Sequence, residues 1–110
     1  MSQPDLGALL AQAQQMQAKM AELQRDLARR RVEGSAGGGM VRAVVSGELR
    51  VLELHVEPDL IASGDRNMLQ DLCAAAVNAA LTNAQRLMQE EIQRVSGGLG
   101  GAMPFPGVGS

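Results

Sequence analysis

The chain contains one histidine whose neighbours could assist it in metal binding or proton transfer. His55 lies between Glu53 and Glu57 at a spacing of two residues, which places the three side chains on one face of a strand. One imidazole with flanking carboxylates matches no recognised spacing of metal ligands. We therefore interpret His55 as a surface histidine and expect no metal site.

The cysteine and the glycine-rich segment also lack the partners that catalysis requires. Cys73 is the only cysteine and lies in an alanine-rich apolar segment, so we interpret it as a small core residue rather than a nucleophile. The three glycines at residues 37–39 are not followed by the Lys-Ser/Thr pair of a phosphate-binding loop. We therefore expect no catalytic residues, no enzymatic activity, no cofactor and no small-molecule substrate.

The basic residues offer a different chemistry, which is the neutralisation of phosphate groups. Residues 1–31 contain five basic and three acidic residues, a net charge of +2, and end in the run Arg29, Arg30 and Arg31. The rest of the chain is acidic, so the formal net charge of the 110 residues is -2. This charge excludes a strongly cationic, histone-like protein, but it permits DNA binding by an unevenly charged one.

The arginine run has a simpler alternative interpretation. Arginines at the end of a helix favour the helix dipole and can pair with Asp26 at spacings of three and four residues. Because blocks of charge are usually solvated surface, composition alone favours this interpretation over phosphate contact.

A heptad pattern predicts that the basic residues of the first segment lie on a long helix. Apolar residues follow the potential N-cap Asp5 at alternating spacings of three and four. They are Leu6, Leu9, Ala13, Met16, Met20, Leu23 and Leu27. We expect a helix over about residues 6–31, with the arginine run in its last turn. The apolar seam could pack on its own chain or on a helix of a second copy, and the two arrangements can coexist.

A small sheet is predicted to follow this helix. Residues 40–46 and 49–56 have the alternation of strands, and the turn signal Ser46-Gly47 lies between them, so we expect an antiparallel hairpin. The region around Val32 is expected to add a third strand.

A second long helix is predicted over residues 66–95, which lack glycine and proline. The fold class is therefore α+β, with a long N-terminal helix, a small antiparallel sheet of about three strands and a long C-terminal helix. We expect residues 1–95 to form one domain and residues 96–110, rich in glycine and proline, to form a flexible tail.

The scarcity of aromatic residues affects both stability and function. Phe105 is the only aromatic residue, so the core buries little area per side chain and we expect self-association. The lack of aromatic residues argues against platforms that stack unpaired bases, which disfavours single-stranded DNA and RNA as ligands. No apolar run approaches the roughly 18 residues of a membrane span, and we expect a cytoplasmic protein with no membrane partner.

The order of helix, small sheet, long helix and Gly/Pro-rich tail resembles the YbaB/EbfC family of bacterial nucleoid-associated proteins. The resemblance rests on residues 12–17, 39–42, 56–60 and 71–80. It implies a tweezer-like homodimer that binds double-stranded DNA in the nucleoid with little sequence specificity. It also implies that the projecting first and last helices contact DNA. The basic candidates on these helices are Lys19, Arg25, Arg29, Arg30, Arg31, Arg86 and Arg94.

The alternative function is a dimeric protein-interaction module that binds DNA only incidentally. The net charge of -2 favours it, and so do Ala11, Thr82 and Asn83, where the resemblance implies basic residues.

Overall fold

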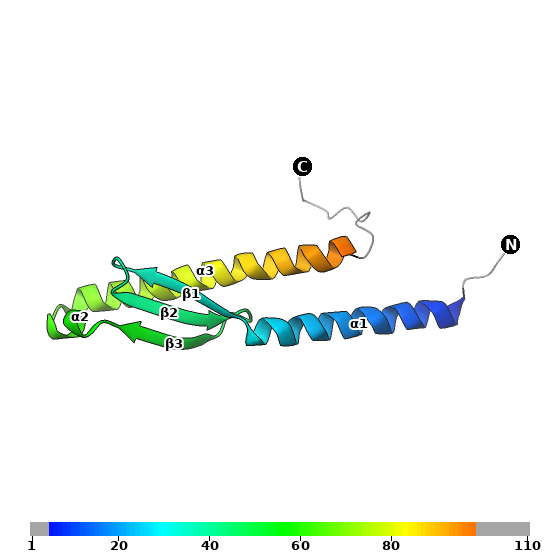
Figure 1. Ribbon diagram of the computed structural model, residues 1–110, viewed down its shortest axis with the longest axis horizontal. Coiled ribbons are helices and arrows are strands. Elements are labelled where there is room, and N and C mark those ends of the chain that lie inside the picture. The colour runs from blue at the N-terminus through cyan, green and yellow to red at the C-terminus, as the bar shows by residue number, and fades with distance from the viewer. Residues whose placement is uncertain (1–4, 99–110) are drawn as a thin grey trace.

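Helix α1 (Leu6–Arg29) extends away from the central sheet (Figure 1). The structure, a computed structural model, describes residues 5–98. As the sequence suggested, Asp5 is the N-cap, and its carboxylate accepts a hydrogen bond of 3.0 Å from the backbone N–H of Gly7. Only Leu23 and Leu27 of α1 are buried, so the helix is attached to the body of the fold through its last two turns.

The prediction that the arginine run lies in the last turn of this helix is confirmed for Arg29 and wrong for Arg30 and Arg31. The helix ends at Arg29, Arg30 is its C-cap with extended backbone, and Arg31 is the first residue of strand β1. The β-branched Val32 packs against the buried core, which favours an extended backbone at this point over another helical turn. The three arginines therefore occupy three different structural environments.

Three antiparallel strands follow in the order β1-β2-β3, which confirms the predicted sheet and the α+β class. They are β1 (Arg31–Ala36), β2 (Val41–Ser46) and β3 (Val51–Val56). The turn between β1 and β2 is built from the three glycines 37–39, all at positive φ, a conformation that costs glycine little. A register shift at Val44 and Val45 places Val51 opposite Val45.

Two helices complete the described chain. The short helix α2 (Pro58–Ala62) was not predicted, because five residues are too few to give a helical periodicity. The long helix α3 (Arg66–Gly98) continues three residues beyond the predicted end at residue 95. Residues 99–110 of the predicted tail lie outside the described residues. No helix within residues 5–98 is long and apolar enough to cross a membrane.

The core lies between one face of the sheet and α3 (Figure 1). Val41, Ala43 and Val45 of β2 are fully buried against a row of alanines on α3, namely Ala76, Ala80 and Ala84. The sheet approaches α3 so closely at Gly34 that a Cβ atom there would lie 2.2 Å from the backbone nitrogen of Ala80. Small residues thus replace aromatic bulk as the means of close packing in this core.

Large apolar side chains remain exposed on α1 and on β3. Leu6 and Leu10 of α1 are 71% and 64% exposed, and Val51 and Leu54 of β3 are 50% and 45% exposed. The chain is correspondingly elongated, with principal extents of 77 × 31 × 16 Å. A single copy therefore leaves much of its apolar surface in contact with water.

Candidate nucleic-acid interface

Three basic residues of α1 are exposed and have no carboxylate partner within the described chain. They are Lys19, Arg25 and Arg29, none of which takes part in an ion pair among residues 5–98. Lys19 and Arg29 help to line an open groove of about 470 Å³ between α1 and the C-terminal part of α3. The residues that line it are Lys19, Glu22, Leu23, Asp26, Arg29 and Val95. This end of α1 therefore offers cations that are available to an anionic ligand.

Arg30 and Arg94 are instead held by a buried carboxylate. The Arg30 Nη2 atom lies 3.3 Å from Oε1 of Glu91, and its Nε atom lies 3.3 Å from Oδ2 of Asp26. Arg94 donates to the same Glu91 oxygen. The pairing of an arginine with Asp26, which the simpler interpretation of the run predicts, is thus confirmed for Arg30. Both arginines are partly neutralised in this structure.

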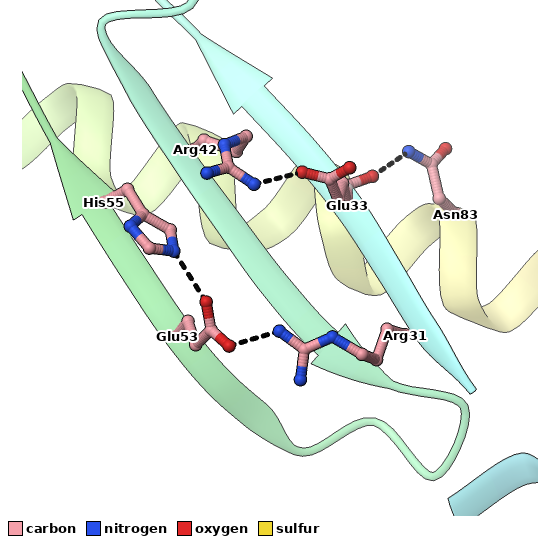
Figure 2. Close-up of polar contacts among 6 residues, drawn as sticks. All are labelled: Arg31, Glu33, Arg42, Glu53, His55 and Asn83. Carbon is pink, nitrogen blue, oxygen red and sulfur yellow. Dashed lines mark hydrogen bonds and ion pairs between the residues drawn. The ribbon is translucent and has the colours of Figure 1, made fainter. Parts of the chain in front are cut away.

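Arg31 belongs to a polar network on the face of the sheet that points away from α3 (Figure 2). Its guanidinium pairs with the carboxylate of Glu53, and the Oε1 atom of Glu53 lies 2.6 Å from the Nε2 atom of His55. The pKa of the Glu53 carboxyl lies below its ordinary value of 4.5. The hydrogen bond from Arg31 is the largest cause of this lowering, and the hydrogen bond with His55 is the second largest. His55 is exposed on the sheet face, which confirms its interpretation as a surface histidine.

A second ion pair on the same face joins β1 to β2. Arg42 donates to the carboxylate of Glu33, as Figure 2 shows. Val44 lies between the two pairs, opposite Glu33 on one side and Glu53 on the other, and it is buried. The charged side chains therefore shield an apolar residue on a face that no helix of residues 5–98 covers. Because both arginines are paired, this face is a weaker candidate for DNA contact than α1.

Arg86 of α3 is exposed and is held by an amide rather than by an acid. Its Nη2 atom donates a hydrogen bond of 2.8 Å to Oδ1 of Asn83, and Nδ2 of Asn83 donates one of 2.9 Å to the backbone carbonyl of Glu33. The positive charge of Arg86 is therefore not neutralised by this contact.

The candidate cations thus fall into two groups. Those without a carboxylate partner in the described chain are Lys19, Arg25, Arg29 and Arg86. Those paired with carboxylates are Arg30, Arg31 and Arg94.

Comparison with known proteins identifies the family of this chain. Residues 2–99 match the family model described as the YbaB/EbfC DNA-binding family. The chain belongs to this family. The resemblance noted in the sequence is therefore confirmed over nearly the whole chain.

Proteins of similar length match most of this chain. A nucleoid-associated protein of Chlorobium phaeovibrioides is 46% identical over 99 residues, which cover 90% of this chain and 89% of that protein. A nucleoid-associated protein of Streptomyces griseus is 44% identical over 106 residues, which cover 96% and 93%. The crystal structure of an uncharacterized protein from Helicobacter pylori shares the fold, with a TM-score of 0.64 at 18% identity, over 88% of this chain and 98% of that one.

Two residues of this YbaB/EbfC chain fix candidate cations in place, and sequence reasoning missed both roles. Glu91 precedes Arg94 by three residues, a spacing from which their contact could have been predicted. Its contact with Arg30 joins residues 61 positions apart, and no local pattern indicates it. Asn83 was noted only as a missing positive charge, whereas in the structure it orients Arg86.

Proposed function

We propose that this protein is a dimeric nucleoid-associated protein of the cytoplasm that binds double-stranded DNA through basic residues on its helices. It binds with low sequence specificity and catalyses no reaction. The observation that carries the proposal is the set of exposed cations on α1, Lys19, Arg25 and Arg29, which lack carboxylate partners among residues 5–98. Membership of a DNA-binding family and the names of its relatives support the proposal.

The chemistry of these side chains favours contact with the phosphate backbone. Lysine and arginine neutralise phosphates and release condensed counterions, a contribution that does not depend on base sequence. Helix α1 has 24 residues and is therefore about 36 Å long at 1.5 Å per residue, roughly one helical turn of duplex DNA. Arg86 adds a further candidate contact on α3, while Arg30, Arg31 and Arg94 contribute only if phosphates displace their carboxylate partners.

The exposed apolar surface supports self-association. The stripe on α1 includes Leu9, Met16 and Met20, which are 50%, 41% and 40% exposed. Strand β3 is an edge strand with apolar side chains in water, and a second copy of the chain would cover such surfaces. Light scattering at micromolar concentration should give twice the mass of one chain, and a stable monomer would contradict the dimer.

A salt series with matched variants tests the binding mechanism. The triple variant Lys19→Ala, Arg25→Ala, Arg29→Ala removes three charges from α1. The control Arg42→Ala, Arg50→Ala, Arg66→Ala removes three charges elsewhere. Gel-shift titration should show wild-type affinity for a duplex falling steeply with salt, and the α1 variant should reduce the slope of log K against log salt by about 3 per chain. Binding that is independent of salt, or equal losses in both triple variants, would contradict the mechanism.

The second candidate is a dimeric protein-interaction module with incidental DNA binding. The ion pairs of Arg30, Arg31 and Arg94 favour it, because they lower the positive charge that a duplex would meet. This function requires that the α1 triple variant retain its normal association with partner proteins and its cellular role. Loss of chromosome association together with the cellular role would exclude it.

A further inference from the structure

Glu91 is the only buried acidic residue among residues 5–98. Its side chain is 7% exposed, and a single oxygen, Oε1, meets both Arg30 and Arg94. A carboxylate removed from water is costly unless cations and hydrogen bonds replace its hydration, and here two arginines do so. The neighbouring Glu90 is exposed and makes no ion pair within the described residues.

The two partners of Glu91 lie on different elements. Arg94 is on α3 itself, one turn further along, whereas Arg30 is the C-cap of α1. The contact with Arg30 therefore joins the end of α1 to the last third of α3. The contact between Arg30 and Asp26 cannot do this, because both residues belong to the same end of α1.

Few other contacts fix the orientation of α1. The backbone N–H of Gly47 donates a hydrogen bond of 2.9 Å to the carbonyl of Leu27, and the side chains of Leu23 and Leu27 are buried. Residues 5–20 are exposed along their whole length. The groove between α1 and α3 extends from these attachments and includes Val95, four residues beyond Glu91. The direction of α1 is therefore set near its C-terminal end, where Glu91 lies.

We propose that Glu91 is a positioning residue that fixes α1 beside α3 and keeps Arg30 and Arg94 from contacting DNA. The first part concerns the chain alone, and the second rests on the proposed function. Phosphates must compete with the buried carboxylate for these two guanidinium groups, since one group cannot satisfy both in full. Duplex binding is thus limited by an acidic residue inside the fold as well as by the number of basic residues on its surface.

Spin-label distances test the positioning role without DNA. Cysteines replace the exposed Gln17 of α1 and Gln89 of α3 in a Cys73→Ala background, and an excess of unlabelled chain leaves only distances within one chain. Glu91→Gln should broaden and lengthen the distance distribution, whereas the control Glu90→Gln, which removes the same charge one residue away, should not. Equal distributions in the two variants would overturn the positioning role.

A second variant covers the case in which Glu91→Gln fails to fold. Arg30→Gln removes the same link from its other end and leaves the carboxylate paired with Arg94. It should also lengthen the distance between α1 and α3, and circular dichroism establishes that the helices persist. A folded Arg30→Gln variant with the wild-type distance would overturn the proposal.

Duplex binding tests the second part of the proposal. Compared with the Glu90→Gln variant, the Glu91→Gln variant should bind a duplex about threefold to tenfold more tightly at low salt. Its slope of log K against log salt should be steeper by about 1 to 2 per chain, because up to two further phosphate contacts become available. Equal affinities in the two variants would overturn the claim that Glu91 keeps Arg30 and Arg94 from contacting DNA. The claim that Glu91 positions α1 would still be decided by the distance experiment. Absence of binding by the wild type as well would overturn the proposed function, and the distance experiment would still decide the role of Glu91 in positioning α1.

Discussion

Asn83 of α3 donates a hydrogen bond of 2.9 Å to the backbone carbonyl of Glu33 in β1, across 50 residues of sequence. Strand β1 is an edge strand, so this contact satisfies an acceptor that no further strand occupies. One side chain therefore joins the edge of the sheet to the long helix (Figure 2). It also accepts a hydrogen bond from Arg86, a candidate DNA contact.

Replacing Asn83 by alanine should lower the free energy of unfolding by about 1 kcal/mol, the usual contribution of one such hydrogen bond. Asn78 is exposed on the same helix and supplies the control variant, Asn78→Ala, which should change the stability little. Urea denaturation measures both. If the two variants are equally stable, the contact between Asn83 and Glu33 does not contribute to the fold.

Gly34 should tolerate no side chain. A Cβ atom there would lie 2.2 Å from the backbone nitrogen of Ala80, and backbone atoms cannot move aside as a flexible side chain can. Gly34→Ala should therefore cost at least about 3 kcal/mol, the upper range of overpacking, and separate β1 from α3. Gly38→Ala is the comparison, because its Cβ meets nothing within 4 Å and only its φ of 66° costs about 1 kcal/mol. Thermal melts that rank the two variants in the opposite order would contradict this packing.

Arg29 and Arg31 differ in partners although they are two residues apart. Arg31→Ala removes a cation already paired with Glu53, whereas Arg29→Ala removes one with no carboxylate partner among residues 5–98. If the protein binds duplex DNA as proposed, Arg29→Ala should reduce the salt slope by about 0.9 per chain and Arg31→Ala by much less. Fluorescence anisotropy with a labelled duplex measures both slopes. A larger loss for Arg31→Ala would place DNA on the sheet face instead.

The contact between Arg31 and Glu53 should make stability depend on pH. Because the pKa of Glu53 is below its ordinary value of 4.5, the unfolded chain binds the proton more readily than the folded chain. The stabilising contribution is therefore present above pH 4.5 and is lost as the pH falls through the lowered pKa of the folded state.

Glu53→Gln removes this contribution, so its stability should fall less than that of the wild type when the pH decreases below 4.5. The exposed Glu57 provides the control variant, Glu57→Gln, which should follow the wild type. NMR titration of the Glu53 carboxyl should show its pKa rise when Arg31 is replaced by glutamine. An unchanged pKa would show that Arg31 is not its main cause.

Local sequence patterns were sufficient to predict most of the elements. The heptad seam from Leu6 to Leu27 predicted α1, because its spacing matches a helical period over several turns. The alternation of Val41, Ala43 and Val45 predicted the buried face of β2, since side chains in a strand alternate between faces. The end of α1 was placed two residues too late, because arginine suits both the last turn of a helix and the start of a strand.

The environment of each candidate cation could not be predicted in the same way. Arg30, Arg31 and Arg29 are equivalent by composition, and only the folded chain distinguishes them through Glu91 and Glu53. The contact between Arg30 and Glu91 depends on how α3 returns past the end of α1, which is a property of tertiary packing. The sequence therefore identified the basic residues, while the fold determined which of them have carboxylate partners.

Because α1 is long, a small rotation at the contact between Arg30 and Glu91 moves the other end of the helix by a large distance. The helix extends about 36 Å from that contact, so a rotation of about 10° at Arg30 displaces the Leu6 end by about 6 Å. Small rearrangements around one buried carboxylate are thereby amplified at the far end of the helix, where the exposed side chains of Leu6 and Leu10 are apolar.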